Sequence, residues 1–173
     1  LYDMQKDFII TLAWPEGMVT ATEAWYDKLF STNGKYRVGH SAIVLINSST
    51  KTTHYFDFGR YHTPKRYGRV RDIETDPDLK VINAIISNEA IVNIKEILLY
   101  LSKMKATHGE GKMYASVLNN VSFKNAFIKA KEMQKTGMLS YGPFVRGGTN
   151  CSRFVASVIK ASLPSFIKRI RLK

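Results

Sequence analysis

The amino-acid sequence predicts an α+β fold in which a small antiparallel sheet packs against helices. Apolar runs rich in β-branched residues gather in the first third of the chain, and apolar residues at helical spacing dominate the rest. The size of the chain agrees with this prediction, because 173 residues with a hydrophobic content of 45% suit one domain with a real core. We therefore expect a single domain over residues 1–173.

The expected strands lie in the first 61 residues. The run DFIITLAWP (7–15) ends at a proline and predicts an N-terminal strand. Two further runs, VGHSAIVLI (38–46) and TTHYFDFGRY (52–61), flank the turn sequence NSSTK and predict a β-hairpin. Between the first strand and the hairpin, ATEAWYDKL (21–29) has the composition of a short helix, and STNGKY (31–36) predicts a turn.

Helices are expected in the remaining two thirds of the chain. Apolar residues recur at helical spacing over Asp76–Lys103, and Pro77 suits the first turn of such a helix. The amphipathic segment 122–137 predicts a second helix, with Ser122 as its cap and Gly137 as its stop.

The last expected helix carries the only cysteine of the chain, Cys151, in its first turn. The segment GGTNCSRFVASVI (147–159) passes from glycines through the cap residues Thr149 and Asn150 to an apolar face, and the helix should run to about Leu163. At a helix N-terminus the backbone N–H groups and the helix dipole stabilise a thiolate and can hold an oxyanion. The alternative is a buried structural cysteine, because free cysteines usually pack as small hydrophobic residues.

A thiolate nucleophile needs a proton acceptor, which is normally a histidine, and the chain has four histidines. His40 is the strongest candidate, because it follows Gly39 at the head of an apolar strand, where packing gives no reason for an imidazole. His54 begins the partner strand, His62 lies in the basic segment after it, and His108 lies in a glycine-rich connection. None of these histidines has the spacing of metal ligands on a helix, so we expect neither a metal nor another cofactor.

The order of these motifs resembles the circularly permuted branch of the papain-like cysteine hydrolases, which includes NlpC-type cell-wall amidases and lecithin–retinol acyltransferase-like enzymes. The resemblance depends on GHSAIVLI and on NCSRFV about a hundred residues later, and it covers roughly residues 36–62 and 141–160. The phrases YFDFGRYHTP and YGPFVRGGTNCSRFV are also similar to bacterial proteins of this branch. The resemblance implies a permuted papain-like fold, Cys151 as nucleophile, His40 as base and a third polar residue on the strand beside His40.

The third residue has two candidates. If the hairpin turns about Ser49 and Thr50, Asp57 lies opposite Ala42 and on the same face as His40, whereas a slip of one residue brings His54 to that face. A carboxylate orients an imidazole and stabilises its protonated form, which favours Asp57. The resemblance favours His54 as the alternative, because acyltransferase-like relatives place a histidine near its position.

Each remaining candidate has a structural alternative. Tyr141 would line the cleft or donate a hydrogen bond to the oxyanion, or it is a packed aromatic residue in a turn. Arg153 would bind an acidic group of the substrate or keep the cysteine ionised, or it faces solvent. The structural alternative for Asp57 is a salt bridge with Arg60 or Arg69.

The formal net charge of +12 favours an anionic partner, such as the cell wall or a membrane surface. The basic residues are densest in HTPKRYGRVR (62–71) and in the tail 167–173, and neither segment matches a nucleic-acid-binding motif, so we expect no specific nucleic acid. A solvated basic face is the simpler interpretation. No apolar run approaches the roughly 20 residues that span a bilayer, so we expect a soluble chain, either cytoplasmic or exported after loss of a signal. The oligomeric state stays open.

The expected function is a thiol-dependent hydrolase that cleaves an amide bond of a peptide or of cell-wall peptide through Cys151 and His40. Within the same fold, the alternative is an acyltransferase or deacylase that acts on lipid. From a different class, the alternative is a non-catalytic binding module that uses its basic surface.

Overall fold

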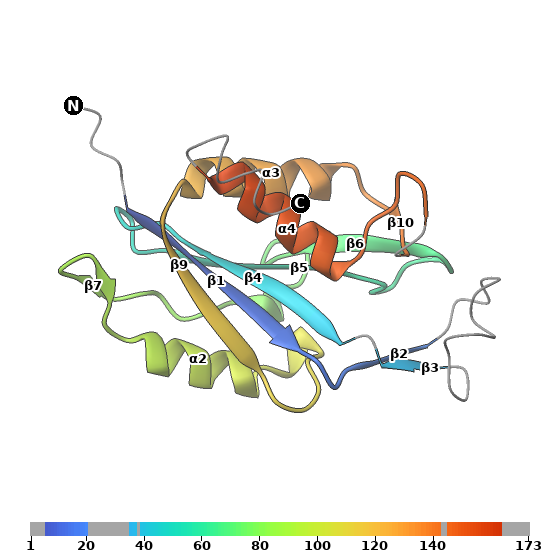
Figure 1. Ribbon diagram of the computed structural model, residues 1–173, viewed down its shortest axis with the longest axis horizontal. Helices are drawn as coiled ribbons and strands as arrows, with labels where there is room; N and C mark the ends of the chain where they lie inside the picture. Colours follow the sequence, from blue (N-terminus) through green and yellow to red (C-terminus); the bar gives the residue numbers. More distant parts are fainter. Residues whose placement is uncertain (1–5, 21–34, 38, 143–144, 164–173) are drawn as a thin grey trace.

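The computed structural model describes residues 6–20, 35–37, 39–142 and 145–163. Within these residues a six-stranded antiparallel sheet has the strand order β10-β6-β5-β4-β1-β9 (Figure 1). Its strands, in chain order, are β1 (Asp7–Trp14), β4 (His40–Ile46), β5 (Thr53–Gly59), β6 (Tyr67–Arg71), β9 (Tyr114–Val121) and β10 (Leu139–Ser140). The predicted α+β class is therefore confirmed.

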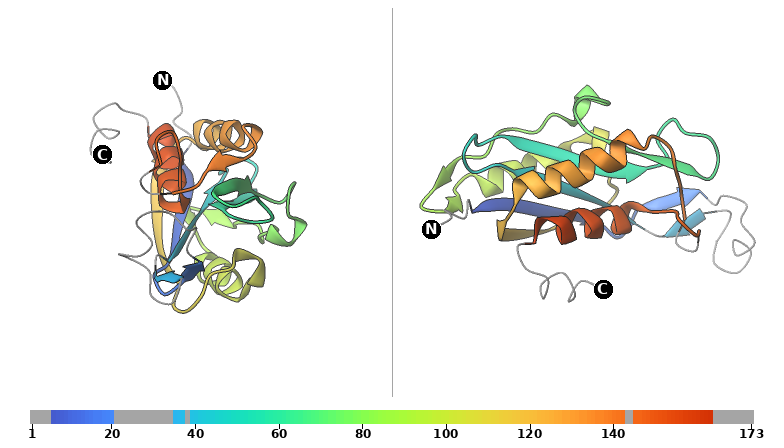
Figure 2. Two further views of the ribbon diagram at one scale, coloured as in Figure 1. Left: turned by 90° about the vertical axis from the view of Figure 1, so that its right-hand side faces the viewer. Right: turned by 90° about the horizontal axis from the view of Figure 1, so that it is seen from above.

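Helices cover both faces of the sheet. Helices α3 (Phe123–Lys135) and α4 (Cys151–Ser162) lie side by side on one face, and α2 (Ile94–Lys103) lies on the other (Figures 1 and 2). The smaller elements are the ribbon of β2 (Met18–Thr20) with β3 (Lys35–Arg37), the ribbon of β7 (Ile86–Ser87) with β8 (Ala90–Ile91), and the short 3₁₀ helices η1 (Pro77–Leu79) and η2 (Lys105–Thr107). In the described part of the chain no helix has the length and apolar character needed to cross a membrane.

The two helical layers create two apolar cores, one on each face of the sheet. Alternate residues of β1 and β4, such as Ile10 and Val44, belong to the core that includes Ile97 of α2. Their neighbours belong to the other core with α3 and α4, where Ile43 is clustered with Phe154. Because both faces are covered, β4 consists of a continuous apolar run rather than an alternation of polar and apolar residues.

The hairpin of β4 and β5 has the register that a turn about Ser49 and Thr50 predicts. Ala42 pairs with Asp57 and Ile43 pairs with Phe56. Gly39 precedes the hairpin with a φ of 65°, and a Cβ atom there would lie 2.6 Å from the carbonyl oxygen of Trp14. Only glycine fits this close approach without strain, so the chain enters β4 at His40 with a fixed geometry.

The caps of the last two helices are also confirmed. The Ser122 side chain accepts a hydrogen bond from the Asn125 N–H at 3.2 Å, and Gly137 follows α3 with a φ of 76°. At the start of α4 the Asn150 side chain accepts a hydrogen bond from the Arg153 N–H at 2.9 Å. These caps satisfy N–H groups that the helices leave without an internal partner, and they place Cys151 as the first residue of α4.

Other predicted elements were wrong. Only the end of the expected helix over Asp76–Lys103 is α-helical, because its first part forms η1, extended chain and the β7–β8 ribbon. Strands β6, β9 and β10 were not predicted, so strands are not confined to the first third of the chain. The helix expected over 21–29 lies outside the described residues.

Candidate active site

The fold brings Cys151 and His40 together, although they come from distant parts of the chain. Helix α4 starts at the end of the sheet where β4 begins (Figure 1), and the hydroxyls of Ser41 and Ser152 lie 3.4 Å apart across this junction. The Cys151 thiol and the His40 imidazole lie close enough for each to shift the pKa of the other. Cys151 is 8% exposed, which means that its surroundings remove most but not all of its contact with water.

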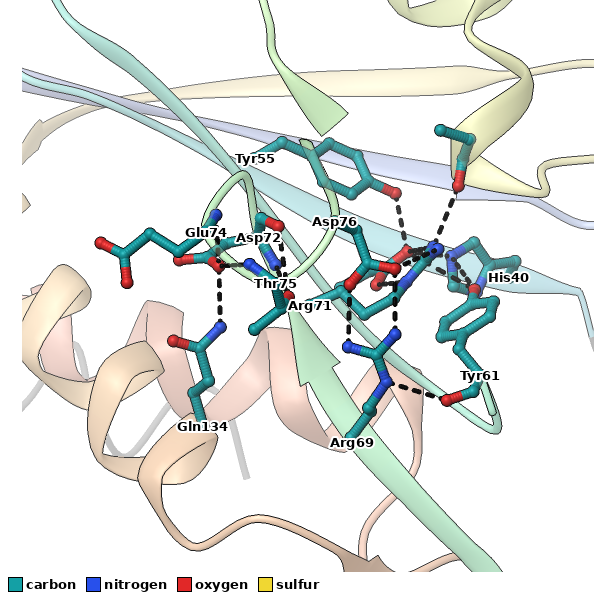
Figure 3. Close-up of polar contacts among 12 residues, drawn as sticks. His40, Tyr55, Tyr61, Arg69, Arg71, Asp72, Glu74, Thr75, Asp76 and Gln134 are labelled. Atoms are coloured by element: carbon teal, nitrogen blue, oxygen red, sulfur yellow. Dashed lines mark hydrogen bonds and ion pairs between the residues drawn. The ribbon is translucent and has the colours of Figure 1, made fainter. Parts of the chain in front are cut away.

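The His40 ring is held from several sides. Its Nε2 atom lies 3.2 Å from Oδ2 of Asp57 and 3.3 Å from the hydroxyl of Tyr61. The ring stacks on Trp14 with 5.7 Å between centroids, and Tyr61 packs edge-on against it. Figure 3 shows His40 beside Tyr61 at one end of a polar network. The imidazole therefore has little freedom to turn.

Asp57 is fully buried, and its carboxylate is the centre of that network. The Tyr55 hydroxyl donates to Oδ2 at 3.0 Å, and Arg71 donates to both carboxylate oxygens, at 3.0 Å to Oδ1 and at 2.6 Å to Oδ2. A salt bridge therefore does form at Asp57, but its partner is Arg71, whereas Arg69 pairs with Asp76. The same carboxylate also faces His40, so a structural ion pair and an imidazole contact coexist at Asp57.

The electrostatics of the three groups favour an ion pair between sulfur and imidazole. Burial raises the pKa of Cys151, but hydrogen bonds from His40 and Ser41 and the charge of His40 outweigh it and lower the pKa to about 7. Burial lowers the pKa of His40, but hydrogen bonds with Asp57 and Cys151 and their charges raise it to about 9. Burial also raises the pKa of Asp57, yet hydrogen bonds from His40 and Arg71 hold that pKa below its ordinary value. The favoured state has a thiolate beside an imidazolium.

His54 does not join this arrangement. It pairs with Leu45 in the hairpin, and its ring packs against Phe123 and Phe127 of α3, with centroid distances of 5.4 and 5.2 Å. Burial lowers the pKa of His54, which favours its neutral form. The observed register therefore places Asp57, and not His54, beside His40.

A cavity of about 270 Å³ lies beside His40. Aromatic and charged side chains line it, and they include Arg60, Tyr61, His108, Glu110 and Tyr141. Tyr141 is among the residues that line the cavity, and its ring also packs on Phe58 at 5.9 Å, so the structure shows features of both sequence interpretations. Arg153 is exposed on α4 with its guanidinium 3.5 Å from the Gly148 carbonyl, and it is not among the residues that line this cavity.

No group of three or more potential metal ligands comes together among the residues that the structure describes. The candidate site combines a cysteine, a histidine and an aspartate. In such an arrangement the histidine can take a proton from the cysteine and later give a proton to a leaving group. The aspartate can hold the imidazole in one orientation during both steps.

Comparison with known proteins places the chain in a family. A model of the type VI secretion system effector TseH-like family matches residues 9–166. The chain belongs to this TseH-like effector family. A crystal structure of the type VI secretion system effector TseH matches with a TM-score of 0.63 and 23% sequence identity, over 91% of this chain and 77% of that chain. At this identity the match shows a shared fold, and a comparison with curated protein sequences finds no match.

Several residues at the site of this TseH-like chain were not predicted from its sequence. From the sequence, Trp14 suits the core or a groove wall, but its stacking on His40 follows only from the pairing of β1 with β4. Tyr61 and His108 stack on each other at 5.1 Å and line the cavity, although they are distant in sequence. Arg71 lay within a segment interpreted as a solvated basic face, and only the pairing of Asp57 with Arg71 between β5 and β6 reveals its position.

Proposed function

We propose that this TseH-like protein is a cysteine amidase that cleaves a peptide-like bond, with Cys151 as nucleophile, His40 as acid and base, and Asp57 as the group that orients His40. The observation that carries this proposal is the position of His40, which lies between the Asp57 carboxylate and the Cys151 thiol. The permuted papain-like order of these residues, with the histidine strand before the cysteine helix, supports the same chemistry.

The reaction would proceed through an acyl-enzyme. The Cys151 thiolate attacks the amide carbonyl, and N–H groups in the first turn of α4 stabilise the oxyanion that forms. His40 then donates its proton to the leaving amine as the carbon–nitrogen bond breaks. Water attacks the thioester with His40 as base, which releases the acid product and restores the thiolate. Asp57 keeps the imidazole oriented and stabilises its protonated form throughout.

The walls of the cavity support a polar substrate rather than a long acyl chain. Arg60 and Glu110 offer opposite charges, and Tyr61 and His108 offer ring faces with polar atoms. A peptide carries amine, carboxylate and amide groups that these side chains can bind, whereas an acyl chain needs a continuous apolar lining. Membership of a secretion-effector family agrees with a target outside the producing cell, and we propose cell-wall peptide as the substrate class.

Incubation of the purified protein with isolated peptidoglycan is expected to release fragments that carry new amino and carboxyl groups. Mass spectrometry of the soluble products identifies the bond that is cut. The control is the same protein with Cys151 blocked by iodoacetamide, which should release nothing, because the chain has no other cysteine. Phospholipid vesicles are tested in parallel. Release of fatty acid or lysolipid from the vesicles, with intact peptidoglycan, would contradict the amidase and support a lipid deacylase.

Amide hydrolysis is expected to follow a bell-shaped pH profile. The rate should rise as the pH passes about 7, where Cys151 ionises, and should fall as the pH passes about 9, where His40 loses the proton that the leaving amine needs. Alkylation of Cys151 by iodoacetamide requires only the thiolate, so its rate should rise near pH 7 and should not fall near pH 9. An amidase profile that rises only near the ordinary cysteine pKa would contradict the ion pair.

A further inference from the structure

Arg71 lies inside the molecule, although its segment has the composition of a basic surface. The residue is 3% exposed and extends from β6 toward Asp57 on the neighbouring strand. Its Nε atom donates to Oδ1 of Asp57, and its Nη2 atom donates to Oδ2 and to the Ala106 carbonyl at 3.0 Å. Its guanidinium carbon lies 3.3 Å from the centre of the Tyr61 ring. Figure 3 shows this side chain at the centre of the network, between Tyr55, Asp76 and the His40–Tyr61 pair.

The bidentate contact fixes the orientation of the Asp57 carboxylate. Arg71 binds both carboxylate oxygens, so the plane of the carboxylate cannot turn without breaking a charge-assisted hydrogen bond. The Oδ2 atom, which also binds Arg71, is the atom that faces His40 at 3.2 Å. An isolated buried carboxylate would tend to take up a proton, and a neutral Asp57 could not stabilise an imidazolium.

We infer that Arg71 is a positioning residue of this site, which keeps Asp57 charged and turned toward His40 and thereby sustains the thiolate–imidazolium pair of the proposed amidase. Arg71 itself touches neither the sulfur nor the cavity beside His40. Its effect passes through Asp57 to His40 and from His40 to Cys151. This inference rests on the proposed function, because it assigns Arg71 a role in activating the same nucleophile.

A purely structural role for Arg71 makes a different prediction. Besides Asp57, the guanidinium contacts the carbonyl of Ala106 within η2 and approaches Asp76, so its loss would loosen the packing of these segments in either case. A structural residue alters the stability of the protein but leaves the pH at which the folded protein ionises Cys151 unchanged. The titration of the thiol therefore separates the two roles.

The test measures the rate of alkylation of Cys151 by iodoacetamide against pH, in the full chain, for Arg71→Met and Arg71→Lys. For Arg71→Met the midpoint is expected to rise from about 7 toward the ordinary cysteine value of about 8.5, and the rate below pH 7 should fall about tenfold. Arg71→Lys keeps the charge but loses the bidentate contact, so its midpoint should lie between the other two. Circular dichroism establishes that each variant is folded. A midpoint that stays at the wild-type value or moves lower in both folded variants would overturn the inference.

A double-variant cycle with Asp57→Asn tests the route through the carboxylate. If Arg71 acts through Asp57, adding Arg71→Met to Asp57→Asn should change the alkylation rate by less than about twofold. An equal shift of the midpoint in both backgrounds would show that Arg71 acts independently of Asp57, which contradicts the inference. The matched control is Lys131→Met, which removes another inward-facing cation, paired with Asp72 on the α3 side. This variant should lose stability and keep the wild-type midpoint.

The same measurements distinguish failure of this inference from failure of the proposed function. If the wild-type thiol titrates like free cysteine, Cys151 is not activated and the amidase proposal fails. If the wild-type midpoint is about 7 and the folded Arg71 variants share it, the amidase proposal survives and only the role of Arg71 is wrong.

Discussion

Replacement of His40 by alanine is expected to reduce amide hydrolysis by about 10³-fold or more, because the protein loses its general acid and base in one step. The same variant should alkylate Cys151 slowly at neutral pH, since the hydrogen bond and the charge that lower the pKa of the thiol both come from His40. The measurements are the turnover of a peptidoglycan fragment and the iodoacetamide rate, both made on protein shown to be folded.

The control for this experiment is His62→Asn. His62 is exposed, follows the end of β5 by three residues, and has a φ of 52° that asparagine tolerates. Its loss removes an imidazole near the site without touching the Cys151–His40 pair, so both rates should stay within about twofold of the wild type. Comparable losses in the two variants would show that general damage, and not the loss of the base, explains the effect of His40→Ala.

Replacement of Asp57 by asparagine is expected to lower turnover by about 10²- to 10⁴-fold, whereas His54→Gln should leave turnover nearly unchanged. An amide cannot stabilise the His40 imidazolium, and it leaves the Arg71 charge without its carboxylate partner. The free energy of unfolding should therefore also fall, by about 3 kcal/mol or more. His54 packs against Phe123 on the opposite face of the sheet, so its replacement should affect packing only.

Asp72→Asn serves as the matched control for the loss of a buried carboxylate. Asp72 is 3% exposed and pairs with Lys131, away from the cysteine. This variant should unfold at a lower temperature and keep its turnover per folded molecule. A large loss of turnover in His54→Gln with full activity in Asp57→Asn would reverse our assignment of the third residue.

The sequence was most informative where local rules determine geometry. The short turn predicted a hairpin register that places Asp57 beside His40, carboxylate chemistry favoured Asp57 over His54, and the observed pairing has this register. The start of α4 was equally predictable, because Asn150 is a strong cap and an apolar face follows it. The β4–β5 hairpin and the start of α4, which carry the candidate site residues, each form through interactions between residues close in sequence.

The remaining elements depend on contacts that local patterns do not encode. Val81, Ala84 and Ile91 have helical spacing, yet they are buried in the α2-side core by a chain that reverses at Asn88 and Glu89, which both have positive φ. In the sequence, the segment that forms β6 was interpreted as part of a solvated basic surface, because it contains two arginines. Its place in the sheet follows from its pairing with β5, where the buried carboxylate of Asp57 forms a salt bridge with Arg71.

The distance along the chain between the two halves of the site has a consequence for biosynthesis. Ser41 and Ser152, the neighbours of His40 and Cys151, meet across 111 positions of sequence. Closing such a long loop carries an entropic cost that only tertiary contacts can offset, so we expect the last helix to dock after the sheet has formed. On the proposed function, the nascent polypeptide then carries an ordinary thiol, and Cys151 becomes a nucleophile only when folding brings it to His40.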